Sequence, residues 1–156
     1  LKACGLLLCT NMTSSIIPAW KRLCPENDAC QEDAMSATPT VESLHSQWVA
    51  AFNAHDLDRH MALYMEDAML FGAVDELQDG RPAIRAYFGG RGPDVRVKSY
   101  PMPLVRQLNA DVAIAAGHVD FADGDKPDPY RMTWVLVRRD GNWRIAQHHG
   151  SRRRGA

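Results

Sequence analysis

The stretch Tyr130–His149, which reads YRMTWVLVRRDGNWRIAQHH, decides the fold. Large apolar side chains at every second position of Tyr130–Val137 predict a β-strand with one apolar face. Asp140-Gly141 then predicts a tight turn, because both residues accept the positive φ that a two-residue hairpin requires. The alternation that follows in Trp143–His149 predicts the returning strand. A two-stranded hairpin is not stable alone in water, so other segments must cover its apolar face.

Three helices are predicted upstream of the hairpin. Thr40 is placed to cap the first helix. Its apolar face recurs at helical spacing in Leu44, Trp48, Ala51 and Phe52. Asn53–Asp56 ends this helix, and Asp56 can cap a short second helix over Leu57–Tyr64. A third helix is predicted over Pro82–Phe88, since proline is tolerated in the first turn of a helix.

Strands are predicted over most of the remaining chain. The first begins with Ala68–Phe71. A long second strand over Val95–Leu108 is interrupted by two prolines, which suits an edge strand or a bulge. The third covers Val112–Phe121, and a polar loop over Ala122–Pro129 leads into the final hairpin. Helices segregated ahead of an antiparallel meander predict the α+β class, with a curved sheet and the helices packed across its concave face.

The two ends of the chain differ in composition from the middle. All four cysteines lie in the first part of the chain, between Cys4 and Cys30, and their spacing matches no CxxC metal pattern. We expect residues 1–34 to form a poorly structured extension. We also hypothesise that this extension is not part of the native chain, because Met35–Pro39 is typical of an ordinary protein start. The folded domain is then predicted over 35–150, and a solvated basic tail over 151–156.

Composition and charge narrow the class of protein. The 156 residues have a formal net charge of −1, and they are 46% hydrophobic and 24% charged, which are ordinary globular values. A charge so close to zero gives no electrostatic case for a nucleic-acid or membrane partner, and we expect neither. The long remainder without cysteine is typical of a reducing compartment, so we expect a cytoplasmic location.

Three motifs occur in order along the chain. Trp48–Leu57 and Tyr64–Ala68 span the opening pair of helices and the segment after them. Gly80–Ile84 enters the third helix, and Val137–Ile145 spans the terminal hairpin. Together they resemble the nuclear transport factor 2-like superfamily, and within it the SnoaL-like and SgcJ/EcaC-type branch. The hairpin is also similar to the association domain of calcium/calmodulin-dependent kinase II. The resemblance covers residues 40–150 and implies a cystatin-like cone.

The resemblance implies several activities, because this superfamily hosts isomerases, cyclases, dehydratases, hydrolases and assembly modules. The ketosteroid-isomerase type needs a carboxylate base and an oxyanion site made of a tyrosine and a protonated acid. The resemblance puts Trp48 in place of that tyrosine, and an indole has no acidic hydroxyl. It puts the base at Leu70–Gly72 and the second acid at Met132, Trp134 or Val135, where no acid stands. Ketosteroid isomerase chemistry is therefore not expected.

His118 and Asp120 are the candidate catalytic residues. They are two positions apart on one predicted strand and therefore share a face. If that face lines the cone, His118 can act as a general acid or base near neutral pH, with Asp120 orienting its ring. The alternative is a histidine at a sheet edge beside a solvated aspartate.

The candidate ligand-binding residues are Trp48, Phe71, Trp134 and His149. The three aromatic residues suit a flat apolar ligand in a cavity, with plain core packing as the alternative. His148 and His149 point to opposite faces of their strand, so only one can enter a pocket. His149 shares its predicted face with Trp143, Ile145 and Gln147. No metal site is expected, because no helical HxxxH and no cysteine pair supports one, and no cofactor is expected.

Two functions remain open. The first is the binding of a small hydrophobic or polyketide-like molecule in the cavity, with an isomerase, cyclase or dehydratase reaction on it. The second is a non-catalytic association module that dimerises. We expect a homodimer through the face of the sheet. A cavity with the His–Asp pair converging on it favours the first function, and a cavity packed solid favours the second.

Overall fold

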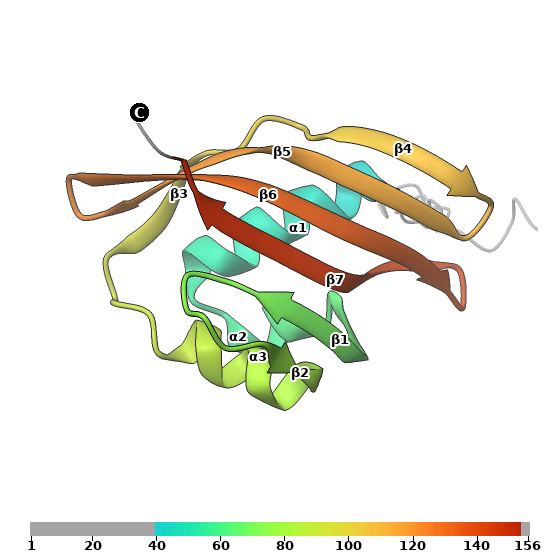
Figure 1. Ribbon diagram of the computed structural model, residues 1–156, viewed down its shortest axis with the longest axis horizontal. Coiled ribbons are helices and arrows are strands. Elements are labelled where there is room, and N and C mark those ends of the chain that lie inside the picture. The colour runs from blue at the N-terminus through green and yellow to red at the C-terminus, as the bar shows by residue number, and fades with distance from the viewer. Residues whose placement is uncertain (1–39, 154–156) are drawn as a thin grey trace, which may run out of the picture. The chain divides into compact units, whose positions relative to one another are not determined.

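The computed structural model describes residues 40–153, in which three helices lie against a seven-stranded curved sheet (Figure 1). The helices are α1 (Val41–Ala54), α2 (Leu57–Met61) and α3 (Gly80–Gly89). The strands are β1 (Tyr64–Phe71), β2 (Gln78–Asp79), β3 (Val95–Ser99), β4 (Leu104–Asn109), β5 (Val112–Asp123), β6 (Lys126–Arg139) and β7 (Asn142–Arg152). The strand order is β2-β1-β7-β6-β5-β3, and β4 also pairs with β5. All pairs are antiparallel except β1 with β7, so the predicted α+β class is confirmed.

Side-chain caps fix the starts of the first two helices, as predicted. The hydroxyl of Thr40 accepts a hydrogen bond from the backbone N–H of Ser43 at 3.2 Å. α1 ends at Ala54, and the next residue, His55, has a left-handed φ of 54° that cannot continue the helix. The carboxylate of Asp56 then caps α2 by accepting from the N–H of Arg59 at 3.0 Å. The prediction that α2 continues to Tyr64 is wrong: the helix ends at Met61, and Tyr64 begins β1.

The terminal hairpin is confirmed. β6 and β7 are antiparallel, and the turn between them has positive φ at Asp140 (51°) and Gly141 (76°). The predicted polar loop over Ala122–Pro129 is wrong, because β5 and β6 pair continuously as far as Asp123 and Lys126. The polar composition of this segment predicted a loop. Both faces of the hairpin tip are exposed, however, and a strand exposed on both faces also carries polar side chains.

The predicted long strand over Val95–Leu108 is two strands. β3 and β4 both pair with β5 in the antiparallel sense, and the segment from Tyr100 to Pro103 between them is not paired. Proline has no N–H to give to a sheet, so the two prolines interrupt the ladder.

A β-bulge in β7 reverses which face its side chains point to. Leu136 of β6 pairs with Ile145, whereas the neighbouring Val135 pairs with Gln147, so Ala146 is an extra residue on β7. One extra residue shifts the alternation by one position and exchanges the two faces. Consequently His148 is buried and His149 is exposed. The prediction that His149 shares a face with Trp143 and Ile145 is wrong.

The hydrophobic core lies between the helices and the concave face of the sheet. Figure 1 shows α1 lying across β5, β6 and β7, with α2 and α3 beside β1. The apolar face predicted for α1 is buried, and Trp48 has no exposed surface. The largest enclosed side chains come from all parts of the fold: Trp48, Tyr64, Leu70, Ile84, Trp134, Leu136 and Ile145.

Candidate functional site

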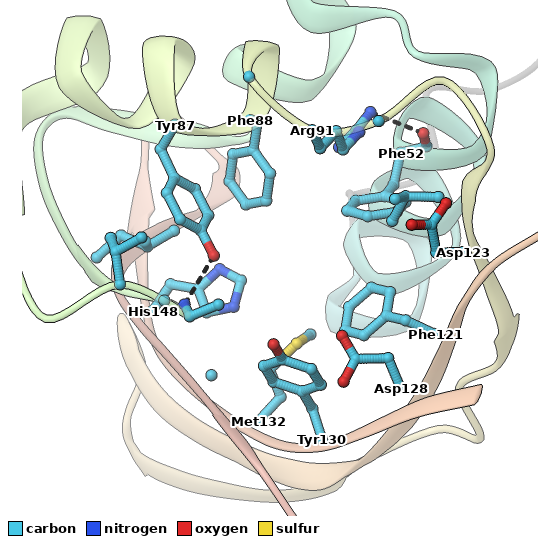
Figure 2. Close-up of a pocket in the computed structure, with 18 of the residues that line it drawn as sticks. Phe52, Tyr87, Phe88, Arg91, Phe121, Asp123, Asp128, Tyr130, Met132 and His148 are labelled. Atoms are coloured by element: carbon cyan, nitrogen blue, oxygen red, sulfur yellow. Dashed lines mark hydrogen bonds between the residues drawn. The ribbon is translucent and has the colours of Figure 1, made fainter. Parts of the chain in front are cut away.

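A cavity of about 530 Å³ opens between the helices and the sheet (Figure 2). Its wall combines residues from α1, α3, β1, β5, β6 and β7. Six aromatic rings line it: Trp48, Phe52, Tyr87, Phe88, Phe121 and Tyr130. Ligand sites are typically hollows of this size, lined mostly by apolar groups with a few polar groups that orient the ligand.

A chain of hydrogen bonds between buried side chains reaches the wall of this cavity. The indole N–H of Trp48 donates to the hydroxyl oxygen of Tyr64 at 3.0 Å. The same hydroxyl lies 2.8 Å from Nδ1 of His148, and the ring of His148 lines the cavity. Trp48 and Tyr64 have no exposed surface, and His148 is 4% exposed. Three segments of the chain thus bring one polar group each to this site.

Burial keeps the two titratable members of this hydrogen-bond network, Tyr64 and His148, uncharged. Burial, followed by the nearby His149, lowers the pKa of His148 from 6.5 to about 3. Burial also raises the pKa of the Tyr64 hydroxyl, although the hydrogen bond from Trp48 opposes that change. His148 is therefore a neutral imidazole at neutral pH. It can donate from one ring nitrogen and accept at the other.

His60 lies behind this wall, without a polar partner among residues 40–153. It has no exposed surface, and neither ring nitrogen makes a hydrogen bond within the described part of the chain. Its ring is in contact range of the rings of Trp48, Phe52, Tyr64 and Phe88, at centroid distances of 4.5–5.9 Å. Burial, followed by the charge of Arg91, lowers the pKa of His60 to about 3. His60 does not line the cavity.

Charged side chains also line the cavity. The guanidinium of Arg91 lies 3.8 Å from the centre of the Phe52 ring and donates to the backbone oxygen of Phe52 at 2.9 Å. Burial, followed by the charge of Arg96, lowers the pKa of Arg91 to about 10. Arg152 and Asp128 form a two-pronged ion pair, with N–O distances of 2.8 and 3.2 Å. Arg91, Asp128 and Arg152 therefore line the cavity together with the aromatic rings.

The four predicted ligand-binding residues divide between the cavity and the rest of the molecule. Trp48 lines the cavity. Trp134 is fully enclosed and packs against Trp48 with a centroid distance of 5.5 Å, but it does not line the cavity. Phe71 is 42% exposed, and its ring lies 6.5 Å from that of His149, which is also exposed. Phe71 and His149 lie outside the cavity.

The predicted catalytic pair lies on the outer face of the sheet. Ala115, Val119 and Phe121 of β5 point towards the core, so the alternate positions of His118 and Asp120 point away from it. His118 is exposed, and the carboxylate of Asp120 accepts a charged hydrogen bond from Arg153. The condition for their proposed role was that this face lines the cone, and it does not.

Tyr64 and His148 were missed by sequence reasoning. Tyr64 follows a short amphipathic helix, and its spacing extended that helix over it. His148 was excluded in favour of His149 by an alternation that the bulge at Ala146 interrupts. The double histidine was nevertheless a usable signal, because one of two neighbouring strand residues must face inwards.

Residues 40–153 show neither a metal-binding cluster nor a helix that could span a membrane. No group of three or more histidine, cysteine, aspartate or glutamate side chains in this range is arranged to hold a metal ion. None of the helices in this range is long and apolar enough to cross a bilayer.

Comparison with known proteins identifies both a family and a fold. The SnoaL-like domain family matches residues 41–153. None of the curated proteins matches the sequence. A putative calcium/calmodulin-dependent protein kinase II association domain from Xanthomonas campestris is 30% identical, with a TM-score of 0.63 over 74% of this chain and 87% of that one.

Two other solved structures share the fold at lower identity. A ketosteroid isomerase-like protein from Erwinia carotovora atroseptica is 21% identical, with a TM-score of 0.63 over 72% of this chain and 92% of its own. An uncharacterized protein with a cystatin-like fold from Caulobacter vibrioides is 17% identical, with a TM-score of 0.65 over 74% and 88% of the two chains. The resemblance and the cystatin-like cone predicted from the sequence are confirmed.

Proposed function

The chain belongs to the SnoaL-like domain family, and from that premise we propose that it binds a small, largely apolar molecule in the cavity. The observation that carries the proposal is a hollow of about 530 Å³ lined by aromatic rings, into which a hydrogen-bonded, neutral His148 projects. A cavity packed solid with side chains would argue for a purely structural role. A flat hydrophobic or polyketide-like molecule suits this wall.

The same geometry limits the reaction. We propose an isomerase, cyclase or dehydratase type of reaction, in which His148 polarises the substrate and does not carry a charge. A histidine whose pKa is about 3 is too weak a base to remove protons well at neutral pH. A neutral imidazole can still polarise a carbonyl group by donating a hydrogen bond.

Thermal shift against a panel of polyketide, steroid and aromatic ketone compounds tests the binding proposal. The matched variant is Gly150→Leu, because Gly150 lines the cavity and does not have positive φ. A Cβ added there meets Tyr130, His148 and Met132 at ordinary contact distances of 3.7–3.9 Å, so a side chain can start from this position without a clash at its Cβ. We expect stabilisation of the wild type by at least one compound and none of the variant. Equal shifts of both proteins, or none of either, contradict the proposal.

A second function, association of two copies, is favoured by the outer face of the sheet. Strand pairing sets Leu104, Ala116, Thr133, His149 and Phe71 side by side in one row across five strands. The next row contains Arg106, Ile114, Val135, Gln147 and Met69. Leu104, Phe71 and Met69 are 62%, 42% and 45% exposed. Leu104 at one end of the row and Phe71 and Met69 at the other expose apolar surface on this face, which supports an interface, and the Xanthomonas relative is described as an association domain.

The association proposal is tested by light scattering at micromolar concentration. We expect a homodimer for the wild type and a monomer for Val135→Glu, because the introduced charge lies in the middle of the outer face. His118→Glu, which adds a charge nearer the edge of the same face, is the control. A monomeric wild type contradicts the homodimer. That result has no bearing on ligand binding in the cavity, which the thermal-shift experiment tests separately.

A further inference from the structure

Counting donors and acceptors fixes the proton positions around Tyr64. An indole nitrogen can only donate, so the N–H of Trp48 takes one lone pair of the Tyr64 oxygen. The hydroxyl has one proton of its own, and among residues 40–153 the acceptor within reach is Nδ1 of His148 at 2.8 Å. If Nδ1 carried a proton instead, the hydroxyl proton would be buried without an acceptor, which costs stability.

The second nitrogen of His148 then carries the ring proton. A neutral imidazole has one N–H, so an Nδ1 that accepts leaves the proton on Nε2. Nε2 is on the side of the ring that faces Gly150, at 3.8 Å from the position of an added Cβ. Gly150, Tyr130 and Met132 all line the cavity, so the Nε2–H group lies at the cavity wall. Both nitrogens of His60 are fully enclosed and lack a hydrogen-bond partner among the described residues, whereas Nε2 of His148 is not enclosed in this way.

This inference rests on the proposed function and names its ligand class. We propose that Trp48 and Tyr64 hold His148 as a neutral imidazole whose Nε2–H is a fixed hydrogen-bond donor to the ligand, so that the ligand carries an acceptor oxygen, such as a ketone, on an otherwise apolar body. Trp48 and Tyr64 are positioning residues, since they act through His148. Their arrangement is made before the ligand arrives, which lowers the cost of ordering the donor.

The hydrogen-bond network also explains why a histidine is tolerated in this wall. The side-chain polar atoms of Trp48 and Tyr64 are paired within the network, so the network itself offers the ligand one donor, the Nε2–H of His148. A ligand that presents only hydrocarbon to that donor removes water from it and accepts no hydrogen bond in return. A donor group on the ligand is rejected more strongly, because two donors cannot pair.

Two isosteric probes test the inference. Acetylnaphthalene and isopropenylnaphthalene have the same shape and differ in a carbonyl oxygen against a methylene group. We expect the wild type to bind the ketone about three- to tenfold more tightly, as measured by quenching of tryptophan fluorescence. The preference should disappear in His148→Phe and persist in His149→Phe, whose altered side chain lies on the outer face.

The outcomes separate this inference from the proposed function. Equal affinity of the wild type for the two probes overturns the fixed donor and leaves ligand binding in the cavity standing. Failure of the wild type to bind either probe overturns both. A ketone preference that survives in a folded His148→Phe variant also overturns the inference, since the donor must then be another group.

Discussion

The hydroxyl of Tyr64 and Nδ1 of His148 lie 2.8 Å apart, although 84 positions separate the two residues in the chain. Parallel pairing of β1 with β7 brings them together, and the bulge in β7 turns His148 towards the core. Trp48 of α1 completes the network from the other side. The site therefore depends on the docking of α1 and on the register of the last strand at the same time.

Tyr64→Phe should destabilise the protein by about 2 kcal/mol or more. The substitution leaves the N–H of Trp48 and Nδ1 of His148 buried without their partner, and each such loss costs about 1–3 kcal/mol. Urea unfolding measures the change. Tyr87→Phe is the matched control, because its hydroxyl accepts one hydrogen bond from the backbone of Ala73 in an exposed loop. Equal effects of the two variants would contradict the assignment of Tyr64 as the centre of the network.

The free energy of unfolding should fall as the pH is lowered from about 6.5 towards 3. His60 and His148 both have pKa values near 3 in the folded protein and an ordinary value of 6.5 when unfolded. Between these values the unfolded chain binds more protons, so each histidine lowers the free energy of unfolding by about 1.4 kcal/mol per pH unit. Urea titrations at pH 7, 6 and 5 measure the slope.

The same titrations on His60→Leu isolate one histidine from the carboxylates that also protonate at low pH. We expect the slope between pH 6 and 5 to be smaller by about 1.4 kcal/mol per pH unit in the variant. An unchanged slope would mean that His60 titrates normally in the folded protein.

His60→Leu should also stabilise the protein at pH 7, by about 1 kcal/mol. The ring nitrogens of His60 are buried without hydrogen bonds to any residue in 40–153, and leucine removes that desolvation cost while filling a similar volume. His118→Leu, on the exposed face, should change stability little. A loss of stability in His60→Leu would show that the imidazole makes a favourable polar contact.

Removal of residues 1–34 should leave the melting temperature within about 2 °C of that of the full chain. The predicted extension lies outside the described residues 40–153. The hydrophobic core of the described residues is assembled from Val41 onwards. Differential scanning calorimetry of the two proteins compares them. A fall of many degrees would make the first segment part of the folded domain.

Much of the fold could be predicted from local pattern. The caps of Thr40 and Asp56 and the turn at Asp140-Gly141 are short-range signals, and the structure contains all three. Alternation and helical spacing identified the core faces of α1 and β6. The exposed hairpin tip after Phe121 was predicted as a loop, because polar composition alone does not distinguish a loop from a strand that is wet on both faces.

The candidate site could not be predicted, because one inserted residue decides it. Strict alternation along β7 selects His149, and nothing in the sequence around Ala146 signals a bulge. The bulge is needed because Trp143 and Ile145 at one end and His148 at the other must all face inwards. Long-range register, set by pairing with both β1 and β6, determines this arrangement.

The proton on His148 is the most direct test of the account. Nitrogen-15 labelling of the histidines, with long-range proton–nitrogen NMR correlation and His148→Phe for assignment, reports the state of each ring nitrogen. The predicted result at pH 7, unchanged at pH 5, is a neutral ring with Nδ1 unprotonated and Nε2 protonated. A proton on Nδ1, on its own or together with one on Nε2, would contradict the account.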